Sequence, residues 1–515
     1  MDSLRGKFLL AGLVILVFLL PCSANFEHVA APMDEGSLLL YPELFLKGKL
    51  PYRDFETFYG PANIFFLSGV YAGFGGPDIL IERGVGLLYQ ILAITGIFLV
   101  VQRWNAVLAA GCMGVAAFLL LPLGLPAFAW MGGVACAIWS IFLSANPESS
   151  KRCLSAGFLA GGAVLFRADL GPAVIASGLP LFLLMSSRRR WGYLAGASVA
   201  MLPLGWLVAA GDVNEILNNL FLFPVLYSGP YRRLPIFSGN VYLIGLFFAH
   251  LLAVFVNIAA GITAVRADRR DQAGRLILAL GLLGLGLTHQ AAQRFDVWHV
   301  LFAAFLSLSA LPLSIFVIRS QFEATESETV RALLATAVAL LMIESITPEL
   351  TGLARKQLLS SVSREGREAV FFEQEGRSFP FASVEEARLV GKMFDRLNSL
   401  ASPGQKLFVG PADLRRTNYN DTFIYYMLPQ FEPASYFLEM NPGSANRPRS
   451  RLARDVGSAD WLILNHELDQ WNEPNGSAEF GSDAPMQVVR AQFELCDRFG
   501  NRDLYRRRAT AITKL

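Results

Sequence analysis

Long apolar segments, separated by short polar turns, follow one another from residue 8 to residue 346. A helix needs about 20 apolar residues to cross a bilayer, with some tolerance for shorter segments. The pattern predicts eleven spanning helices, at residues 8–24, 79–101, 105–121, 126–145, 153–167, 171–186, 191–210, 239–265, 275–292, 298–318 and 330–346. A further apolar, glycine-rich segment at 62–76 either re-enters the membrane or crosses as a short span, and we expect that it does not cross fully.

The basic residues between these segments predict how the chain is oriented. They gather at Arg5/Lys7, Arg103, Lys151/Arg152, Arg188–Arg190 and 266–275. If 62–76 does not cross, all of them lie on one side, which the positive-inside rule makes the cytoplasmic side. The residues after the first span (25–78), the turns near 167–169 and 293–299, the loop 211–238 and the C-terminal part then share the outer side. Cys22-Ser23-Ala24 loosely resembles a signal-peptidase site, but we expect the first span to remain as an anchor.

Composition separates a second domain from the membrane part. Of the 515 residues, 53% are hydrophobic and 17% are charged, whereas soluble domains carry about 25% charged residues. The deficit lies in residues 1–346, so 347–515 are predicted to form a separate water-soluble domain. Its pattern predicts a helix at 384–400, strands at 406–409 and 460–464, and an antiparallel pair at 486–499 and 503–508. We therefore expect an α-helical polytopic membrane protein with a C-terminal extracytoplasmic α/β domain. The aromatic residues of this domain are expected mainly in its core: Tyr419, Tyr425, Tyr426, Tyr436, Trp461 and Trp471.

Several classes of function find no support in the sequence. There is no basic and aromatic footprint for nucleic acid and no glycine-rich nucleotide-binding motif. The five cysteines form no metal-binding pattern. His289 and His299, ten residues apart, do not by themselves make a metal site. We expect no cofactor, and a divalent metal has no support.

The most unusual polar residues follow the first apolar segment. Ala31-Pro-Met-Asp34-Glu35-Gly is followed by Gly48-Lys-Leu-Pro-Tyr-Arg53-Asp54-Phe-Glu-Thr-Phe-Tyr59-Gly60-Pro61. Carboxylates at a membrane surface can act as general bases or bind cations. Neighbours on a helix point about 100° apart, so Asp34 and Glu35 cannot both face one substrate atom. One of the two residues would then take part in the reaction, and the other would support it from a different direction. The alternative is an ordinary polar loop in which Asp34 caps a helix that runs through 38–45.

Three later turns carry cations at the ends of apolar segments. Arg167 precedes Asp169, and the two either bind an anion or pin a turn to each other. The stretch 227–235 contains Arg232 and Arg233, which suit an anionic lipid head or belong to an ordinary juxtamembrane loop. The stretch 289–299 contains Arg294, Asp296 and His299, together with Trp298, a reasonable interface anchor. Arginine suits phosphate binding because its planar guanidinium group can donate two parallel hydrogen bonds to phosphate oxygens.

The Asp-Glu-Gly pattern after the first span, with Gly-x-x-Pro-Tyr-x-Asp-Phe and Tyr-Gly-Pro, resembles the first external loop of the GT-C glycosyltransferases. Within them it is similar to the branch of protein mannosyltransferases and aminoarabinose transferases that use polyprenyl-phosphate sugars. The resemblance covers roughly the first 320 residues and is specific in 34–61. It implies that Asp34 is the general base, that Glu35 orients it or contacts the acceptor, and that Asp54 positions acceptor or lipid-phosphate partners. It also implies that arginines hold the donor phosphate. The full set of candidate donor and substrate contacts is Arg294, Arg167, Arg53, Tyr59, Arg232, Arg233, His299 and Asp296.

The resemblance implies an inverting transfer of a sugar from a polyprenyl-phosphate donor to an extracytoplasmic glycan, lipid or protein hydroxyl, in a bacterial inner membrane. Two departures stand against it. Gly60 lies where some relatives have a phosphate-binding lysine, and the turn Leu121–Trp130 has no acid. One alternative is a transporter or flippase of lipid-linked sugars, which would show internal repeats and polar residues in broken helices at mid-membrane. The other is a non-catalytic membrane scaffold with a glycan-binding outer domain, in which Asp34 would be dispensable.

Overall fold

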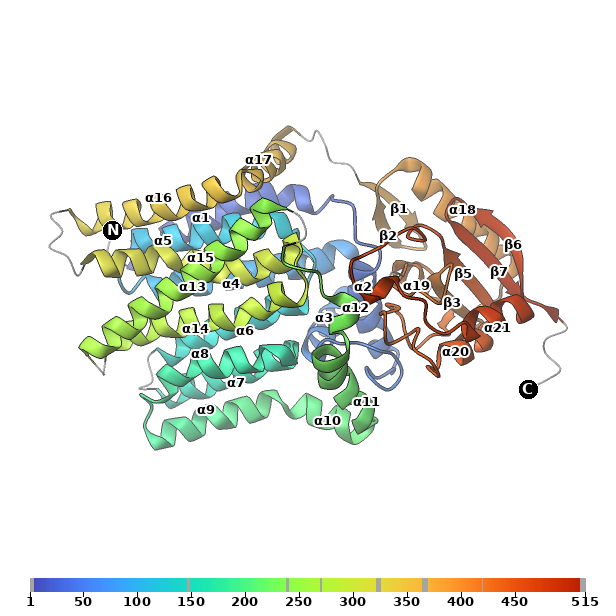
Figure 1. Ribbon diagram of the computed structural model, residues 1–515, viewed down its shortest axis with the longest axis horizontal. Coiled ribbons are helices and arrows are strands. Elements are labelled where there is room, and N and C mark those ends of the chain that lie inside the picture. Colours follow the sequence, from blue (N-terminus) through green and yellow to red (C-terminus); the bar gives the residue numbers. More distant parts are fainter. Residues whose placement is uncertain are drawn as a thin grey trace.

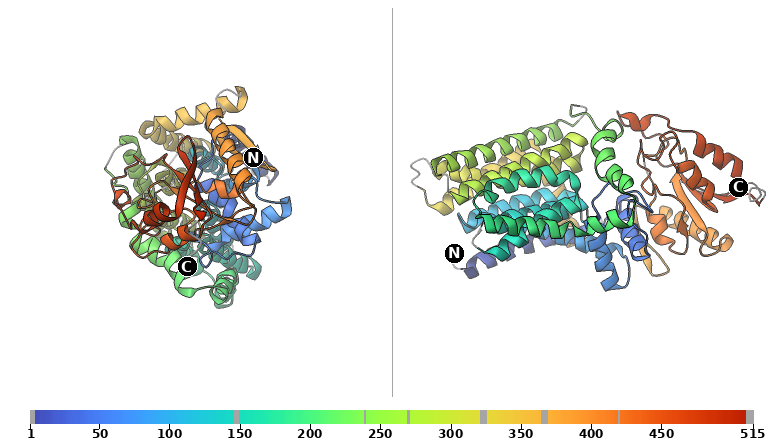
Figure 2. Two further views of the ribbon diagram at one scale, coloured as in Figure 1. Left: turned by 90° about the vertical axis from the view of Figure 1, so that its right-hand side faces the viewer. Right: turned by 90° about the horizontal axis from the view of Figure 1, so that it is seen from below.

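The computed structural model describes residues 4–145, 149–237, 240–268, 271–320, 326–363, 369–418 and 420–509. A bundle of long helices makes up one end of the molecule, and a smaller part built around a β-sheet makes up the other end (Figure 1). Seen along the long axis, the sheet part covers one end of the bundle (Figure 2). The short elements between the two parts position the candidate site.

Every predicted spanning segment is helical. The helices are α1 (Leu4–Asn25), α4 (Ile79–Val101), α5 (Ala106–Leu120), α6 (Ala129–Ser144), α7 (Ser150–Phe166), α8 (Gly171–Phe182), α9 (Ser187–Ala200) continued by α10 (Leu202–Ala210), α13 (Val241–Ala267), α14 (Gln272–Gln293), α15 (Val297–Ser320) and α16 (Glu328–Ile346). Within the described residues, eight helices are long and apolar enough to cross a membrane, and α6 and α8 lie in shorter apolar helices. The chain is therefore a multi-pass membrane protein. The number of eleven crossings and the orientation stay predictions.

Two short helices from the first loop lie where the bundle meets the sheet part (Figure 1): α2 (Asp34–Leu46) and α3 (Pro61–Phe74). With 14 residues, α3 is about 21 Å long, whereas the hydrocarbon layer is about 30 Å thick. It packs against α2, because the Tyr71 hydroxyl donates to the Leu38 carbonyl at 3.2 Å and Ser68 donates to the Pro42 carbonyl at 3.1 Å. Other segments predicted to span are as short, so whether α3 crosses the membrane stays a prediction.

Further short elements complete the junction. The loop after α10 folds into α11 (Val213–Leu217), a wider π-helical segment (Asn218–Tyr227) and α12 (Gly229–Arg232). After α16, α17 (Pro348–Ser363) packs against α1. Its Gln357 amide donates to the side chain of Asn25 and to the Leu121 carbonyl, each at 3.2 Å. The segment predicted as a polar connection is thus partly a helix that packs on the bundle, and a domain boundary at residue 346 stays a prediction.

The C-terminal part is a mixed α/β structure. Its elements are β1 (Val370–Gln374), β2 (Arg377–Phe381), α18 (Val384–Leu400), β3 (Lys406–Pro411), α19 (Phe423–Met427), β4 (Glu432–Pro433), α20 (Leu452–Ser458), β5 (Trp461–Asn465), α21 (Ala484–Gln492), β6 (Phe493–Phe499) and β7 (Arg502–Arg507). The larger sheet has the order β4-β3-β5-β7-β6. Strand β3 is parallel to β4 and β5, and β7 is antiparallel to β5 and β6. The predicted helix at 384–400, the strands near 406 and 460 and the final hairpin are confirmed.

Two predictions for this part are wrong. Residues 484–492 form α21 instead of the first half of a strand, because Pro485 lies in the first turn, where its missing N–H costs nothing. Trp471 is 47% exposed and does not belong to the core. Tyr419 lies outside the described residues. The other four aromatic residues named above are buried as expected.

The C-terminal part docks directly on α2. The Thr422 hydroxyl donates to the carbonyls of Pro32 and Met33 at 3.0 and 2.6 Å, and Arg377 forms a bidentate ion pair with Glu43 at 2.8 Å. Gly36 permits this approach, since a Cβ there would lie 2.4 Å from the Phe423 backbone nitrogen. The glycine of the Asp-Glu-Gly pattern therefore has a packing reason: it lets the C-terminal part contact the helix that carries Asp34.

Candidate active site

A cavity of about 620 Å³ lies where the bundle, α2, α12 and the C-terminal part meet. It is lined by residues from all the outer turns that the sequence placed on one side: Asp34, Tyr59, Arg167, Arg232, Arg294, Asp296 and His299. The C-terminal part adds Glu439, Met440, Asn441, Trp471 and Glu473. The predicted convergence of these turns is therefore confirmed. The C-terminal part, which the sequence placed on the same side as these turns, supplies part of the wall, although the sequence did not indicate which of its residues do so.

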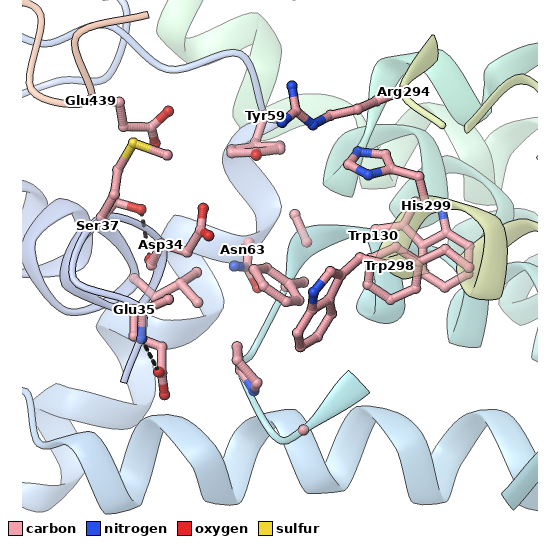
Figure 3. A pocket seen from close by; sticks show the side chains of 18 of the residues that line it. Asp34, Glu35, Ser37, Tyr59, Asn63, Trp130, Arg294, Trp298, His299 and Glu439 are labelled. Carbon is pink, nitrogen blue, oxygen red and sulfur yellow. Dashed lines mark hydrogen bonds between the residues drawn. The ribbon is translucent and has the colours of Figure 1, made fainter. Parts of the chain in front are cut away.

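Asp34 is the first residue of α2, and its side chain makes no capping hydrogen bond to the helix. The alternative interpretation, in which Asp34 caps this helix, is wrong, because the capping position is occupied by Met33. Its carboxylate faces the cavity beside Asn63 and Glu439 (Figure 3). Burial and the nearby charge of Glu439 raise the pKa of Asp34 to about 6, against the opposing effect of Arg232 and Arg294. A carboxylate with this pKa is a stronger base than a solvated one and is still ionised at neutral pH.

Glu35 points away from Asp34 and into a buried ion pair. Its carboxylate meets Arg83 of α4 at 2.7 and 3.1 Å, and both residues are 2% exposed. Arg83 also donates to the carbonyls of Phe26 and His28, at 2.8 and 2.9 Å. Glu35 thus ties α2 and the chain that precedes it to the bundle. Of the two adjacent acids, Asp34 is the one whose side chain is available for chemistry.

Arg53 and Asp54 do not line the cavity. Arg53 pairs with Asp54 at 2.7 Å, and the Asp54 carboxylate accepts from the Leu50 backbone N–H at 2.7 Å. Tyr52, directly before Arg53, has φ +69°, an uncommon value for a residue with a side chain. The structure therefore shows these two residues fixing the shape of a tight turn. A role for either in substrate binding stays a prediction.

The segment around Gly60 brings Tyr59 and Arg167 together. The Gly60 N–H donates to the Phe166 carbonyl at 3.0 Å. A Cβ on Gly60 would lie 2.0 Å from the Leu165 carbonyl oxygen, so no lysine fits here without moving the backbone. The Arg167 guanidinium lies 5.5 Å from the centre of the Tyr59 ring and pairs with Asp169 at 2.9 Å. Arg167 both pins its turn and presents a cation to the cavity.

Arg294 and its neighbours form the opposite wall from Asp34 (Figure 3). The Arg294 guanidinium donates to Asp296 at 2.9 Å and to Glu473 at 3.0 Å. His299 meets the other oxygen of Asp296 at 2.8 Å. Glu473 comes from the C-terminal part, and no local sequence pattern marked it.

Arg232 on α12 also lines the cavity, whereas Arg233 is exposed and does not. Within the described part of the chain, the Arg232 guanidinium makes no ion pair and no hydrogen bond, although its backbone carbonyl accepts from Arg294 at 3.4 Å. Its charge acts on both Asp34 and Glu439, whose pKa values it lowers. Arg232 therefore has the full donor set of its guanidinium available for an anion.

Aromatic side chains line the wall below Arg294 and His299 (Figure 3). Trp130 stacks on Phe302 with ring centroids 4.3 Å apart, and Trp298 lies beside it. The indole nitrogen of Trp130 is buried and has no hydrogen-bond partner in the described structure. The sequence singled out Trp298 only as an interface anchor and did not single out Trp130. Such a wall suits a sugar ring, which stacks its C–H face on indoles and offers hydroxyls to an N–H. Within the described residues, no group of three or more His, Cys, Asp or Glu side chains is placed to hold a metal ion.

Solved structures similar to this chain include two of ArnT from Cupriavidus metallidurans. The match to the structure bound to undecaprenyl phosphate has a TM-score of 0.55 and 15% identity and covers 100% of both chains. The match to the apo structure has a TM-score of 0.55 and 14% identity and covers 99% of each chain. An Archaeoglobus fulgidus oligosaccharyltransferase matches with a TM-score of 0.46 and 12% identity, over 96% of this chain and 72% of that one. No family model matches the chain, and no curated protein sequence matches it. The resemblance to GT-C glycosyltransferases is confirmed at the level of the fold.

Proposed function

We propose that this protein is a membrane glycosyltransferase that moves a hexose or pentose from a polyprenyl-phosphate donor to an acceptor hydroxyl, with inversion at the anomeric carbon. The observation that carries the proposal is the arrangement of the cavity. An accessible carboxylate with a raised pKa, Asp34, faces a wall of arginines across a space large enough for a sugar. The ArnT structure bound to undecaprenyl phosphate has the same overall fold over its whole length.

In the proposed reaction, Asp34 takes the proton from the acceptor hydroxyl while the hydroxyl oxygen attacks the anomeric carbon. The bond between that carbon and the phosphate oxygen breaks, and the polyprenyl phosphate leaves with the electron pair. One displacement without an enzyme-bound intermediate inverts the configuration. The protein contributes a positioned base and fixed charges where negative charge develops.

The arginines differ in how they meet the leaving phosphate. Arg232 makes no ion pair within the described residues, so it gains a partner when the phosphate arrives. Arg294 and Arg167 already pair with carboxylates. These carboxylates hold the two guanidinium groups in place and reduce the positive charge that the groups offer to a phosphate. We assign Arg232 the most direct phosphate contact, supported by Arg294 and Arg167. The Trp130 and Trp298 wall would hold the donor sugar between these arginines and Asp34.

The proposed setting follows from the charge pattern of the loops. The acceptor, a glycan, lipid or protein hydroxyl, approaches from the extracytoplasmic side, and the donor enters from the membrane. The inner membrane of a bacterium is the proposed location. The domain division at residue 346, with the C-terminal domain outside, belongs to the same proposal.

The test is transfer of labelled sugar by Asp34→Asn in membranes that contain a polyprenyl-phosphate sugar pool. Loss of a general base lowers the rate by about a hundredfold or more, so we expect kcat to fall at least that far while expression stays normal. Asp395→Asn, an exposed acid on α18, is the matched control and keeps wild-type activity. Unchanged transfer by Asp34→Asn would contradict the mechanism. It would also favour the transporter or scaffold, which a lipid-flipping assay then separates.

A further inference from the structure

Glu439 of the C-terminal part is a second acid in the wall that carries Asp34. It lies on the same side of the cavity as Asp34 and Ser37, across from Arg294 and His299 (Figure 3). The side chain is 8% exposed. Among the charged groups near Asp34, Glu439 has the largest effect on the pKa of Asp34, larger than that of the adjacent Glu35. The two carboxylates therefore face the same part of the cavity.

The segment that carries Glu439 is held in one conformation. The Asn420 amide donates to the Leu438 carbonyl at 2.5 Å, and the Asn441 amide donates to the Glu439 carboxylate at 3.2 Å. Met440 has φ +54°, in the left-handed region that residues with a side chain rarely adopt. Such strain persists only where the surroundings enforce it, and it gathers at functional sites.

A hydroxyl of α2 lies next to Glu439. Tyr41 of α2 lines the cavity and is 4% exposed. Its hydroxyl lies within reach of the Glu439 carboxylate, although the two do not meet in good hydrogen-bond geometry. A ligand hydroxyl placed between them would donate to Glu439 and accept from Tyr41.

The charges of the cavity restrict what can bind on this side. Arg167 is paired with Asp169, and Arg294 is paired with Asp296 and Glu473. Arg232 is then the cation left to face Asp34 and Glu439 among the described residues that line the cavity. Once a donor phosphate occupies Arg232, the opposing charge that remains is that of Arg294, which acts on Asp34 but is already paired with Asp296 and Glu473. An acceptor that brought a phosphate or carboxylate beside Asp34 and Glu439 would meet two like charges in a poorly solvated space.

We propose that Glu439 binds the acceptor and that the acceptor is an uncharged sugar. One of its hydroxyls is presented to Asp34, and a neighbouring hydroxyl donates to Glu439 and accepts from Tyr41. This inference rests on the proposed function and narrows its acceptor from any glycan, lipid or protein hydroxyl to a polyhydroxylated neutral group. Under this inference, the C-terminal part takes part in acceptor recognition through Glu439.

The experiment measures acceptor kinetics with the purified full-length protein in lipid nanodiscs. Undecaprenyl-phosphate mannose and undecaprenyl-phosphate aminoarabinose serve as donors. Methyl hexosides and disaccharides serve as acceptors, and each is compared with its 6-phosphate. We expect the wild type to use neutral acceptors at least tenfold better than their phosphates. Glu439→Gln should raise the KM for neutral acceptors about tenfold, as expected for one hydrogen bond to a charged group. Its kcat should stay within about threefold of wild type, and its discrimination against phosphates should shrink.

Controls separate this inference from the proposed function. Glu432→Gln changes an exposed acid of the same part and should leave every constant unchanged, and Asp34→Asn should lower kcat. Glu439→Asp keeps the charge and withdraws it by one methylene, so it should raise KM even if the Gln variant fails to fold. If the wild type transfers sugar but the Glu439 variants keep its KM, or phosphorylated acceptors are preferred, only the inference fails. If the wild type neither transfers sugar nor binds undecaprenyl phosphate, the proposed function fails and the inference with it.

Discussion

At the scale of single residues, the pKa of Asp34 makes the proposed reaction depend on pH. A general base must be ionised, and the pKa of Asp34 is about 6. We therefore expect kcat/KM to rise with pH, with a midpoint near 6, and to level off near neutrality. Arg232→Gln removes a charge that lowers this pKa, so its rising limb should move to higher pH, beyond any loss of phosphate binding. A profile without an acidic limb would contradict the role of Asp34 as base, and a limb that Arg232→Gln leaves in place would show that the Arg232 charge does not act on the titrating group.

Local sequence was enough to single out four residues that line the cavity, because each stands out as a polar residue at the end of an apolar segment. They are Asp34, Arg167, Arg294 and His299. Arg53 and Asp54 also stood out in the sequence, but they pair with each other in a turn and do not line the cavity. Glu439, Glu473 and Trp130 could not be found this way. The two acids come from the far end of the chain, and an indole in an apolar helix is usually only core packing.

At the scale of elements, the contact between Gly60 and the end of α7 sets the position of Tyr59 and Arg167. Gly60→Ala should destabilise the protein by about 1–3 kcal/mol, as overpacking does, because the added Cβ meets a backbone carbonyl that cannot rotate away. Gly69→Ala in α3 is the control. Nothing lies within 4 Å of its Cβ, and alanine favours a helix over glycine by about 1 kcal/mol. Thermal unfolding in detergent should show a lower midpoint for the first variant only, and equal midpoints would show that the contact is loose.

The buried pair of Glu35 and Arg83 is a second element-scale contact, because it joins α2 to α4. Removing one partner of a buried pair costs about 3–5 kcal/mol, so Arg83→Met should lower the unfolding midpoint strongly and reduce the yield of folded protein. The double variant Glu35→Gln with Arg83→Met leaves no uncompensated charge and should recover most of the loss. Measurable sugar transfer by the double variant would show that Glu35 has a structural role. A double variant that folds but does not transfer sugar would indicate that Glu35 takes part in the reaction.

The elements themselves were largely predictable, because apolar length and turn residues decide helices in a membrane protein. All eleven predicted segments are helical, and α18 matches its predicted bounds. The error at α21 has a local cause. The apolar residues around Val488 fit a strand and a helix equally well over so short a stretch, and Pro485 in the first helical turn decided the outcome.

At the scale of the whole molecule, the proposed site depends on how the C-terminal part docks on α2, which no local pattern predicts. Gly36→Ala tests this docking. Alanine is the better helix former by about 1 kcal/mol, so α2 alone would gain stability. Its Cβ would however lie 2.4 Å from the Phe423 nitrogen and 2.5 Å from the Thr422 hydroxyl. We expect the C-terminal part to be pushed away, which moves Glu439 from its place on the same side of the cavity as Asp34.

The measurement is hydrogen exchange along the chain together with acceptor kinetics. In Gly36→Ala, the backbone N–H of Phe423, which donates to the Pro32 carbonyl at 3.1 Å, should exchange at least tenfold faster, and the acceptor KM should rise. Binding of undecaprenyl phosphate should change little, because Arg167, Arg232 and Arg294 come from the bundle and its loops. Gly73→Ala, whose Cβ meets nothing within 4 Å, should match the wild type in all three. If Gly36→Ala instead weakens lipid-phosphate binding and leaves the acceptor KM unchanged, the docked C-terminal part shapes the donor side of the cavity, and acceptor recognition lies elsewhere.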